Sequence, residues 1–139
     1  MIDLLVSAGV LLFLDQWSKR MIETRVADRL ISWGSILRIR RIIHAKKVYK
    51  RPGVRAALVV LWFAALVSAM ILYFHGTRFQ TQTAMCGLGA AFGGAAGNLR
   101  DILRRRSIID FIDLRCWPVF NVADIGIVGG LLAALWARG

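Results

Sequence analysis

The sequence is poor in the residues that build several common kinds of functional site. Its 139 residues include two cysteines, two histidines and two prolines. Cys86 and Cys116 are too few for a disulfide framework and lack metal-ligand spacing, so we interpret both as small apolar fillers. His44 and His75 lie in different predicted loops, and no serine–histidine pairing is evident. We therefore expect neither a metal site nor a bound cofactor.

Acidic residues are scarce as well: eight Asp and Glu face 19 Lys and Arg, for a net charge of +11. Such an imbalance is typical of proteins that bind nucleic acid or anionic lipid. Because 58% of the chain is hydrophobic and lies in long runs, we expect membrane lipids rather than nucleic acid. One basic cluster is interpreted either as a phosphate-contacting surface or as flanking charge that anchors helix ends. It comprises Arg38, Arg40, Arg41, Lys46, Lys47, Lys50 and Arg51.

Four apolar segments are close to the roughly 20 residues that a membrane-spanning helix needs. They cover residues 2–17, 56–74, 83–99 and 119–136. Residues 1–14 lack a basic beginning and an Ala-x-Ala cleavage site, so we expect a retained first span rather than a signal peptide. The predicted fold is an all-α integral membrane protein, with residues 1–139 as a single domain.

The connections between the segments have their own patterns. Residues 37–40 alternate apolar and basic side chains, which predicts a short strand at the membrane surface between the first two spans. We expect residues 100–118 to form a basic loop. In the third segment Gly89, Gly93 and Gly97 share one helix face. That face serves either helix packing alone or, in addition, leaves room for a ligand or acyl chain.

Polar side chains gather at matching ends of the predicted spans. In a bundle of four spans, the end of an odd span and the start of the next even span lie on one side. The polar residues at these positions should therefore converge at one membrane face, where ionisable groups are costly and usually functional. They are Asp15 and Lys19, then Asn98 and Asp101, then Asp110, and finally Asn121 and Asp124.

Two carboxylates that meet at a membrane interface need not both ionise, because they can share a proton. Aspartic proteases use this arrangement: one carboxylate takes a proton from water while the other polarises the scissile carbonyl. We expect Asp113 to be a solvated interface charge rather than a third catalytic acid.

Three stretches carry a more specific resemblance. They read Gly-Asn-Leu-Arg-Asp at residues 97–101, Ile-Ile-Asp-Phe at 108–111 and Trp-Pro-Val-Phe-Asn-Val-Ala-Asp at 117–124. In order and spacing they resemble the signature of the signal peptidase II family, the lipoprotein signal peptidases. That signature reads Gly-Asn-x-x-Asp-Arg, Val-x-Asp-Phe and Phe-Asn-x-Ala-Asp. Residues 15–19 resemble the family's first-span element Asp-Gln-x-x-Lys.

The resemblance implies a multi-pass aspartic endopeptidase of the bacterial inner membrane that needs no cofactor. Such an enzyme, expected here as a monomer, removes the signal peptide of a prolipoprotein just before its diacylglyceryl-modified cysteine. Position by position, the resemblance implies Asp110 and Asp124 as the catalytic dyad. The supporting or substrate-binding residues it implies are Asn98, Asp101, Asn121, Asp15 and Lys19.

The chain departs from the family pattern at three places. Ile102 replaces the arginine after the Asn-x-x-Asp aspartate, so a guanidinium contact to Asp101 is lost unless Arg104 or Arg105 supplies it. Arg106 replaces a glycine, at a turn where a positive φ would cost arginine more. The first long loop, at residues 41–47, lacks the family's Asn-x-Gly element. The alternative function is therefore a non-catalytic relative that binds lipoproteins or anionic lipids.

Two expectations about orientation conflict. Of the 19 lysines and arginines, 17 fall within residues 19–55 and 100–115, on the side of the expected dyad. Basic loops usually remain in the cytoplasm, which would place the dyad there. The family resemblance instead implies an active site near the outer face, with both termini in the cytoplasm.

Overall fold

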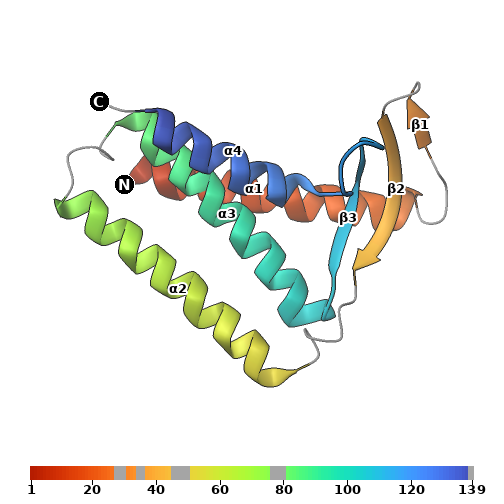
Figure 1. Cartoon of the computed structure of the whole chain (residues 1–139), viewed down its shortest axis with the longest axis horizontal. Helices are drawn as coiled ribbons and strands as arrows, with labels where there is room; N and C mark the ends of the chain where they lie inside the picture. Colours follow the sequence, from red (N-terminus) through yellow and green to blue (C-terminus); the bar gives the residue numbers. More distant parts are fainter. Residues whose placement is uncertain (27–30, 34–36, 45–50, 76–80, 138–139) are drawn as a thin grey trace.

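A computed structural model describes residues 1–26, 31–33, 37–44, 51–75 and 81–137 of the chain. Its helices are α1 (Ile2–Met21), α2 (Pro52–His75), α3 (Gln82–Arg105) and α4 (Val122–Trp136), and α1 continues into the π-helical turn η1 (Ile22–Val26). The start of α1 and the end of α4 lie at one end of the helices, and a small sheet lies at the other (Figure 1). Helices at all the predicted positions are confirmed, although α3 runs past residue 99 and α4 begins after residue 119.

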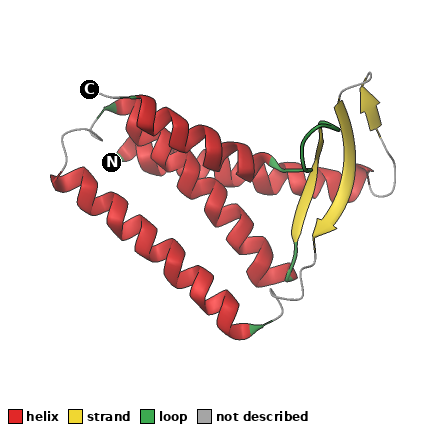
Figure 2. Cartoon of the chain, in the orientation of Figure 1, coloured by secondary structure: helices red, strands yellow, loops and turns green. Residues whose placement is uncertain are grey.

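Three helices, α1, α3 and α4, pack closely together, whereas α2 stands apart along α3 (Figure 2). Glycines on α3 permit this close approach. A Cβ added at Gly97 would lie 2.5 Å from the Asp15 carboxylate, and one added at Gly93 would collide with the backbone of Ala8 on α1. The glycine face is therefore filled by α1, and the suggestion that it leaves room for a ligand is wrong.

Helix α2 contacts α3 through an aromatic side chain near its middle. The Trp62 indole N–H donates to the Phe92 carbonyl oxygen over 3.4 Å, and the two rings meet edge to face with centroids 6.3 Å apart. Helix α2 is nevertheless less tightly packed against α3 than α1 and α4 are.

The sheet has three antiparallel strands in the order β1 (Ile31–Trp33), β2 (Leu37–His44) and β3 (Ile108–Asp113). Strand β2 confirms the strand predicted at residues 37–40. Strand β3 pairs Asp110 with Ile42 of β2, and it lies within the stretch that we predicted to be a loop. That prediction is wrong because four of the six residues of β3 are buried, so the strand lacks the alternation that would identify it.

The sheet is held against the helices by a small apolar core. Ile22 and Val26 of η1 pack with Phe111 of β3, and Ile112 and Val122 extend the cluster toward α4. This core fixes β3 beside the ends of α1 and α3 and the start of α4, and so determines where Asp110 lies.

Helix α3 ends at a left-handed residue. Arg106 has φ 56° and ψ 25°, and its backbone N–H donates to the Ile102 carbonyl oxygen over 3.1 Å. The positive φ expected where the family has glycine is thus present, although the residue is arginine. Within the described residues, none of the helices combines the length and the apolar character required to cross a membrane.

Candidate active site

The site is built around the first turn of α4. Asn121 is the N-cap residue: its Oδ1 accepts a hydrogen bond from the Asp124 backbone N–H over 3.0 Å. In return, Asp124 Oδ2 accepts one from the Asn121 backbone N–H over 3.1 Å. This reciprocal capping box satisfies two backbone donors at the start of the helix and fixes the direction of the Asp124 side chain.

The Asn121 side-chain amide reaches in the other direction, toward β3. Its Nδ2 donates to Asp110 Oδ1 over 2.6 Å and lies 3.4 Å from the Ile109 carbonyl oxygen. Asn121 is fully buried and Asp110 is 8% exposed. A single residue therefore donates hydrogen bonds to both expected catalytic carboxylates, through its amide to Asp110 and through its backbone to Asp124.

Asn98 links the end of α3 to the same group. Its Nδ2 donates to Asp124 Oδ1 over 2.9 Å, so each oxygen of the Asp124 carboxylate accepts one hydrogen bond. Its Oδ1 accepts from Asn121 Nδ2 over 3.2 Å and from Lys19 Nζ over 3.0 Å. Because donors occupy its oxygen, the amide of Asn98 is held with its nitrogen toward Asp124.

Lys19 lies at the centre of a buried ionic cluster behind this site. Its ammonium is 2.9 Å from Asp15 Oδ2 and 2.8 Å from Asp101 Oδ2, and all three side chains are 1% exposed or less. Asp15 Oδ1 in turn accepts from the Ala123 backbone N–H over 3.0 Å, which ties α1 to the first turn of α4. The cluster thus joins α1, α3 and α4 at one level.

Two residues outside the predicted set complete the cluster. Gln16 Nε2 donates to Asp15 Oδ2 over 3.0 Å and to Asp101 Oδ1 over 3.3 Å. Arg105 Nε lies 3.9 Å from Asp101 Oδ1, while its guanidinium also pairs with Glu23. Arg105, one turn after Asp101, therefore places a guanidinium near Asp101, beyond hydrogen-bond distance, where Ile102 supplies none. Gln16 was recognisable from the first-span element. Arg105 was one of two arginines considered as a replacement, and choosing it required the finding that α3 is still helical at Arg105.

The expectation that Asp113 is a solvated interface charge is wrong. This residue is 5% exposed rather than solvated, and its Oδ1 accepts from the Arg115 backbone N–H over 2.9 Å. This contact holds the turn after β3, where Arg115 has a positive φ of 60°. The seven residues singled out in the sequence nevertheless lie where the sequence analysis expected them, at one end of the bundle, joined by hydrogen bonds and ion pairs.

Part of the expected basic surface, Lys46, Lys47 and Lys50, lies outside the described residues, as do residues 45–47 of the loop that lacks Asn-x-Gly. In the described part of the chain, no group of acidic, histidine or cysteine side chains has the arrangement of a metal site. Cys86 and Cys116 are both free thiols.

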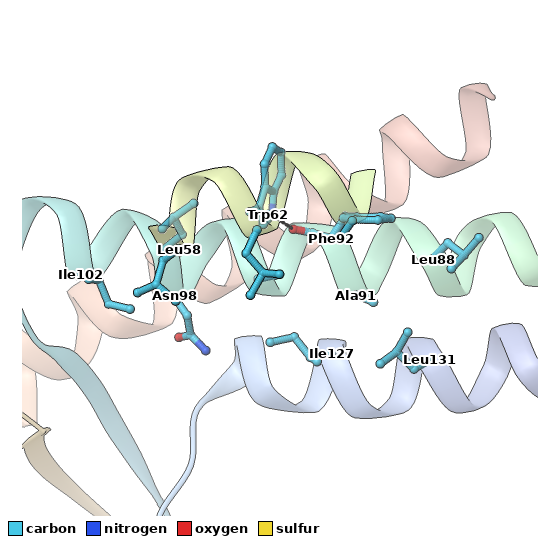
Figure 3. A pocket seen from close by; sticks show the side chains of 13 residues that line it. Leu58, Trp62, Leu88, Ala91, Phe92, Asn98, Ile102, Ile127 and Leu131 are labelled. Atoms are coloured by element: carbon cyan, nitrogen blue, oxygen red, sulfur yellow. Dashed lines mark hydrogen bonds between the residues drawn. The ribbon is translucent and has the colours of Figure 1, made fainter. Parts of the chain in front are cut away.

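An apolar cavity of about 400 Å³ opens between α2, α3 and α4. Leu58 and Trp62 of α2, Phe92 of α3, and Ile127 and Leu131 of α4 contribute to its walls. Figure 3 shows the Asn98 amide at the end of the cavity nearest the start of α4. The cavity is therefore apolar along its length and reaches, at one end, a side chain that contacts Asp124.

Comparison with solved structures identifies the class of fold. Two structures, each described as a bacterial membrane enzyme solved by the in meso method, superpose with TM-scores of 0.82 and 0.79. Each covers 99% of this chain, and this chain covers 92% and 87% of theirs, at 19% sequence identity. The helices and the small sheet therefore have the fold of a bacterial membrane enzyme.

Comparison of sequences identifies the family. The family described as signal peptidase (SPase) II matches residues 7–138. The lipoprotein signal peptidase of Halothermothrix orenii is 31% identical over 93% of this chain and 92% of its own length. That of Moorella thermoacetica is 33% identical over 95% and 89%, and that of Pelotomaculum thermopropionicum is 55% identical over 62% and 56%. The chain belongs to the signal peptidase II family.

Proposed function

We propose that Asp110 and Asp124 are the catalytic pair with which this member of the signal peptidase II family, a membrane aspartic protease, removes signal peptides from prolipoproteins. The observation that carries the proposal is the double role of Asn121, which donates to Asp110 through its amide and to Asp124 through its backbone. The bond cleaved is the one before the diacylglyceryl-modified cysteine.

In the mechanism that aspartic proteases use, one carboxylate of such a pair is ionised and the other protonated. The ionised carboxylate takes a proton from the attacking water, and the protonated one donates a hydrogen bond to the scissile carbonyl oxygen. Asn98 and Asn121 hold the carboxylates in place, and the Lys19 cluster holds Asn98 in turn. Asp15 and Asp101 support the site through Lys19 without touching substrate.

The apolar cavity supplies the means to bind the substrate. Its walls match the apolar part of a signal peptide or the acyl chains of the lipid-modified cysteine, and its Asn98 end lies beside Asp124. Apolar substrate bound along α2 and α3 would thus present its scissile bond at the carboxylates. Because the cavity has few polar atoms, it also favours apolar ligands, whose surface is removed from water when they bind.

We also propose that α1 to α4 are four spans of a single domain, which acts as a monomer in the bacterial inner membrane. Large apolar side chains that face away from the helix bundle support this placement. Among them Phe13 of α1 is 66% exposed, Val60 of α2 is 66% exposed, and Leu132 of α4 is 62% exposed. Lipid would cover these side chains.

Cleavage of a diacylglyceryl-modified prolipoprotein by the purified full-length chain tests the proposal. We expect Asp110→Asn and Asp124→Asn each to reduce the rate by at least about 10³-fold, since each variant lacks one of the two carboxyl groups. Asp3→Asn, near the opposite end of α1, is the matched control and should cleave normally. Cleavage by Asp124→Asn at the wild-type rate would rule out this pair; no cleavage by the wild type would favour the non-catalytic, lipoprotein-binding alternative.

Orientation can be read from the native thiols. Cys116 is exposed after β3, close to the proposed active site, whereas Cys86 is half-buried near the start of α3. A membrane-impermeant maleimide added to intact cells should label Cys116 if the site faces outward, and Cys116→Ser gives the background. Labelling only after the cells are opened would place the site inside, as the basic residues predict.

A further inference from the structure

A second groove, of about 460 Å³, lies on a different side of α3, between α3 and the end of α1. It differs from the apolar cavity in its charge. Its walls include four arginines, Arg20, Arg100, Arg104 and Arg105, and one acidic residue, Glu23. The groove thus carries a formal charge of +3.

Only some of these arginines have partners within the protein. Arg105 pairs with Glu23, and Arg100 donates to Gln16. The guanidinium groups of Arg20 and Arg104 make no hydrogen bond or ion pair to any other described residue, although both line the groove. Two guanidinium groups that line one groove without a carboxylate partner are suited to a phosphate, which each can contact with two N–H donors.

The same groove has an apolar side. Phe13 and Trp17 lie on the face of α1 that carries Arg20, one turn apart, and they are 66% and 53% exposed. Tryptophan beside arginine is the combination found where a membrane protein meets lipid headgroups, because the indole lies at the interface while the cation contacts phosphate. A free phosphate ion would use the arginines but not the two aromatic side chains.

We propose that this groove is a binding site for an anionic phospholipid such as phosphatidylglycerol. Arg20 and Arg104 contact its phosphate, while Phe13 and Trp17 pack against the beginning of its acyl chains. The lining of the groove shares no residue with the substrate cavity, although a pocket lined by Trp62, Leu99, Arg100 and Arg104 lies between the two. The proposed site also gives Arg20 and Arg104 a role that does not depend on membrane orientation.

The groove is connected to the buried cluster through side chains that belong to both. Gln16 accepts from Arg100 in the groove and donates to Asp101 in the cluster, and Arg105 contacts Glu23 and Asp101. A phosphate bound in the groove would therefore be linked, through Gln16 or Arg105, to Asp101, which pairs with Lys19.

Native mass spectrometry of the detergent-solubilised full chain, titrated with phosphatidylglycerol or phosphatidylcholine, tests the proposal. We expect the wild type to bind phosphatidylglycerol at least about 10-fold more tightly than phosphatidylcholine. Arg20→Gln with Arg104→Gln should weaken that binding about 30-fold, at about 1 kcal/mol for each arginine. The double variant Arg25→Gln with Arg51→Gln removes the same charge outside the groove. It should change the affinity for phosphatidylglycerol less than about 3-fold.

Equal binding of the two lipids, or equal losses in both double variants, would overturn the proposal. Excess inorganic phosphate separates the two sources of the anion: we expect it not to displace the lipid, and displacement would show a simple anion site instead. Phosphatidylglycerol with brominated acyl chains should quench tryptophan fluorescence less in Trp17→Phe than in the wild type, and unchanged quenching would contradict the assignment. None of these measurements depends on whether the chain cleaves prolipoproteins.

Discussion

Replacing Lys19 with methionine removes the ammonium that contacts both buried carboxylates of the ionic cluster while preserving much of the side-chain volume. Lys19 is 1% exposed, and its ammonium lies within 3.0 Å of Asp15, Asp101 and Asn98. After the change, Asp15 and Asp101 would remain buried without the ammonium, and among the described residues Arg105, 3.9 Å from Asp101, would be a nearby cation.

The expected cost follows from this geometry. Removing one partner of a buried ion pair destabilises a protein by about 3–5 kcal/mol, because the other charge stays buried without compensation. Here one cation serves two carboxylates, so the upper part of that range applies. For a chain of this size the loss corresponds to a fall in Tm of roughly 10–20 °C.

Thermal unfolding in detergent, followed by circular dichroism, measures the effect. Arg25→Met is the matched control, since Arg25 is exposed and its loss should change stability by no more than about 0.5 kcal/mol. Combining Lys19→Met with Asp15→Asn removes one uncompensated charge and should recover at least about 1 kcal/mol.

A Tm for Lys19→Met within the range of the Arg25→Met control would refute the reasoning, because it would mean that the buried carboxylates do not depend on the ammonium. Failure of Asp15→Asn to restore any stability would refute the narrower statement that Asp15 is one of the charges left uncompensated.

Three further predictions concern backbone fit and the cap of α4. Arg106→Gly should raise stability by about 0.5–1 kcal/mol in the same unfolding assay, since glycine adopts the φ of 56° without strain; a loss would contradict this. Gly93→Ala should lower the free energy of unfolding by about 1–3 kcal/mol, because the added Cβ collides with the Ala8 backbone. Gly129→Ala has open space around it and should be neutral or stabilising. Asn121→Ser keeps a cap acceptor but loses the amide donor to Asp110, so prolipoprotein cleavage should fall at least about 10-fold while the Tm falls less than in Asn121→Ala. Wild-type cleavage by Asn121→Ser would show that the amide is dispensable.

Much of the fold could be predicted because apolar runs of helical length are a strong signal. The four helices were found at the expected positions, and the alternation at residues 37–40 predicted β2. Strand β3 was missed because burial of most of its residues removes the alternation on which strand prediction relies. The end of α3 was placed too early because its last two turns mix charged residues with Ile102 and Leu103, and so interrupt the apolar run on which the prediction relied.

The gathering of these polar residues at one end of the bundle was predictable for a related reason. Asp15, Lys19, Asn98, Asn121 and Asp124 occur at the ends and beginnings of apolar runs, where connectivity alone brings them to one side. The burial of Asp113 was not predictable, because it depends on the turn at Arg115 and on the strand that carries it. The role of Arg105 required knowing that α3 is still helical one turn after Asp101.

The sequence by itself determined which residues lie at the same end of the molecule and to which family the pattern belongs, since hydrophobic length and chemical order along the chain are local properties. Only the tertiary structure decided how the polar groups are paired: that Asn121 donates to both Asp110 and Asp124, and that Lys19 neutralises two carboxylates. It also decided that the glycine face is filled by α1, that the apolar cavity opens between α2, α3 and α4, and that the arginine-lined groove lies between α3 and the end of α1. Hydrogen bonds and close packing depend on distances between separate helices, and no local pattern in a sequence specifies those distances.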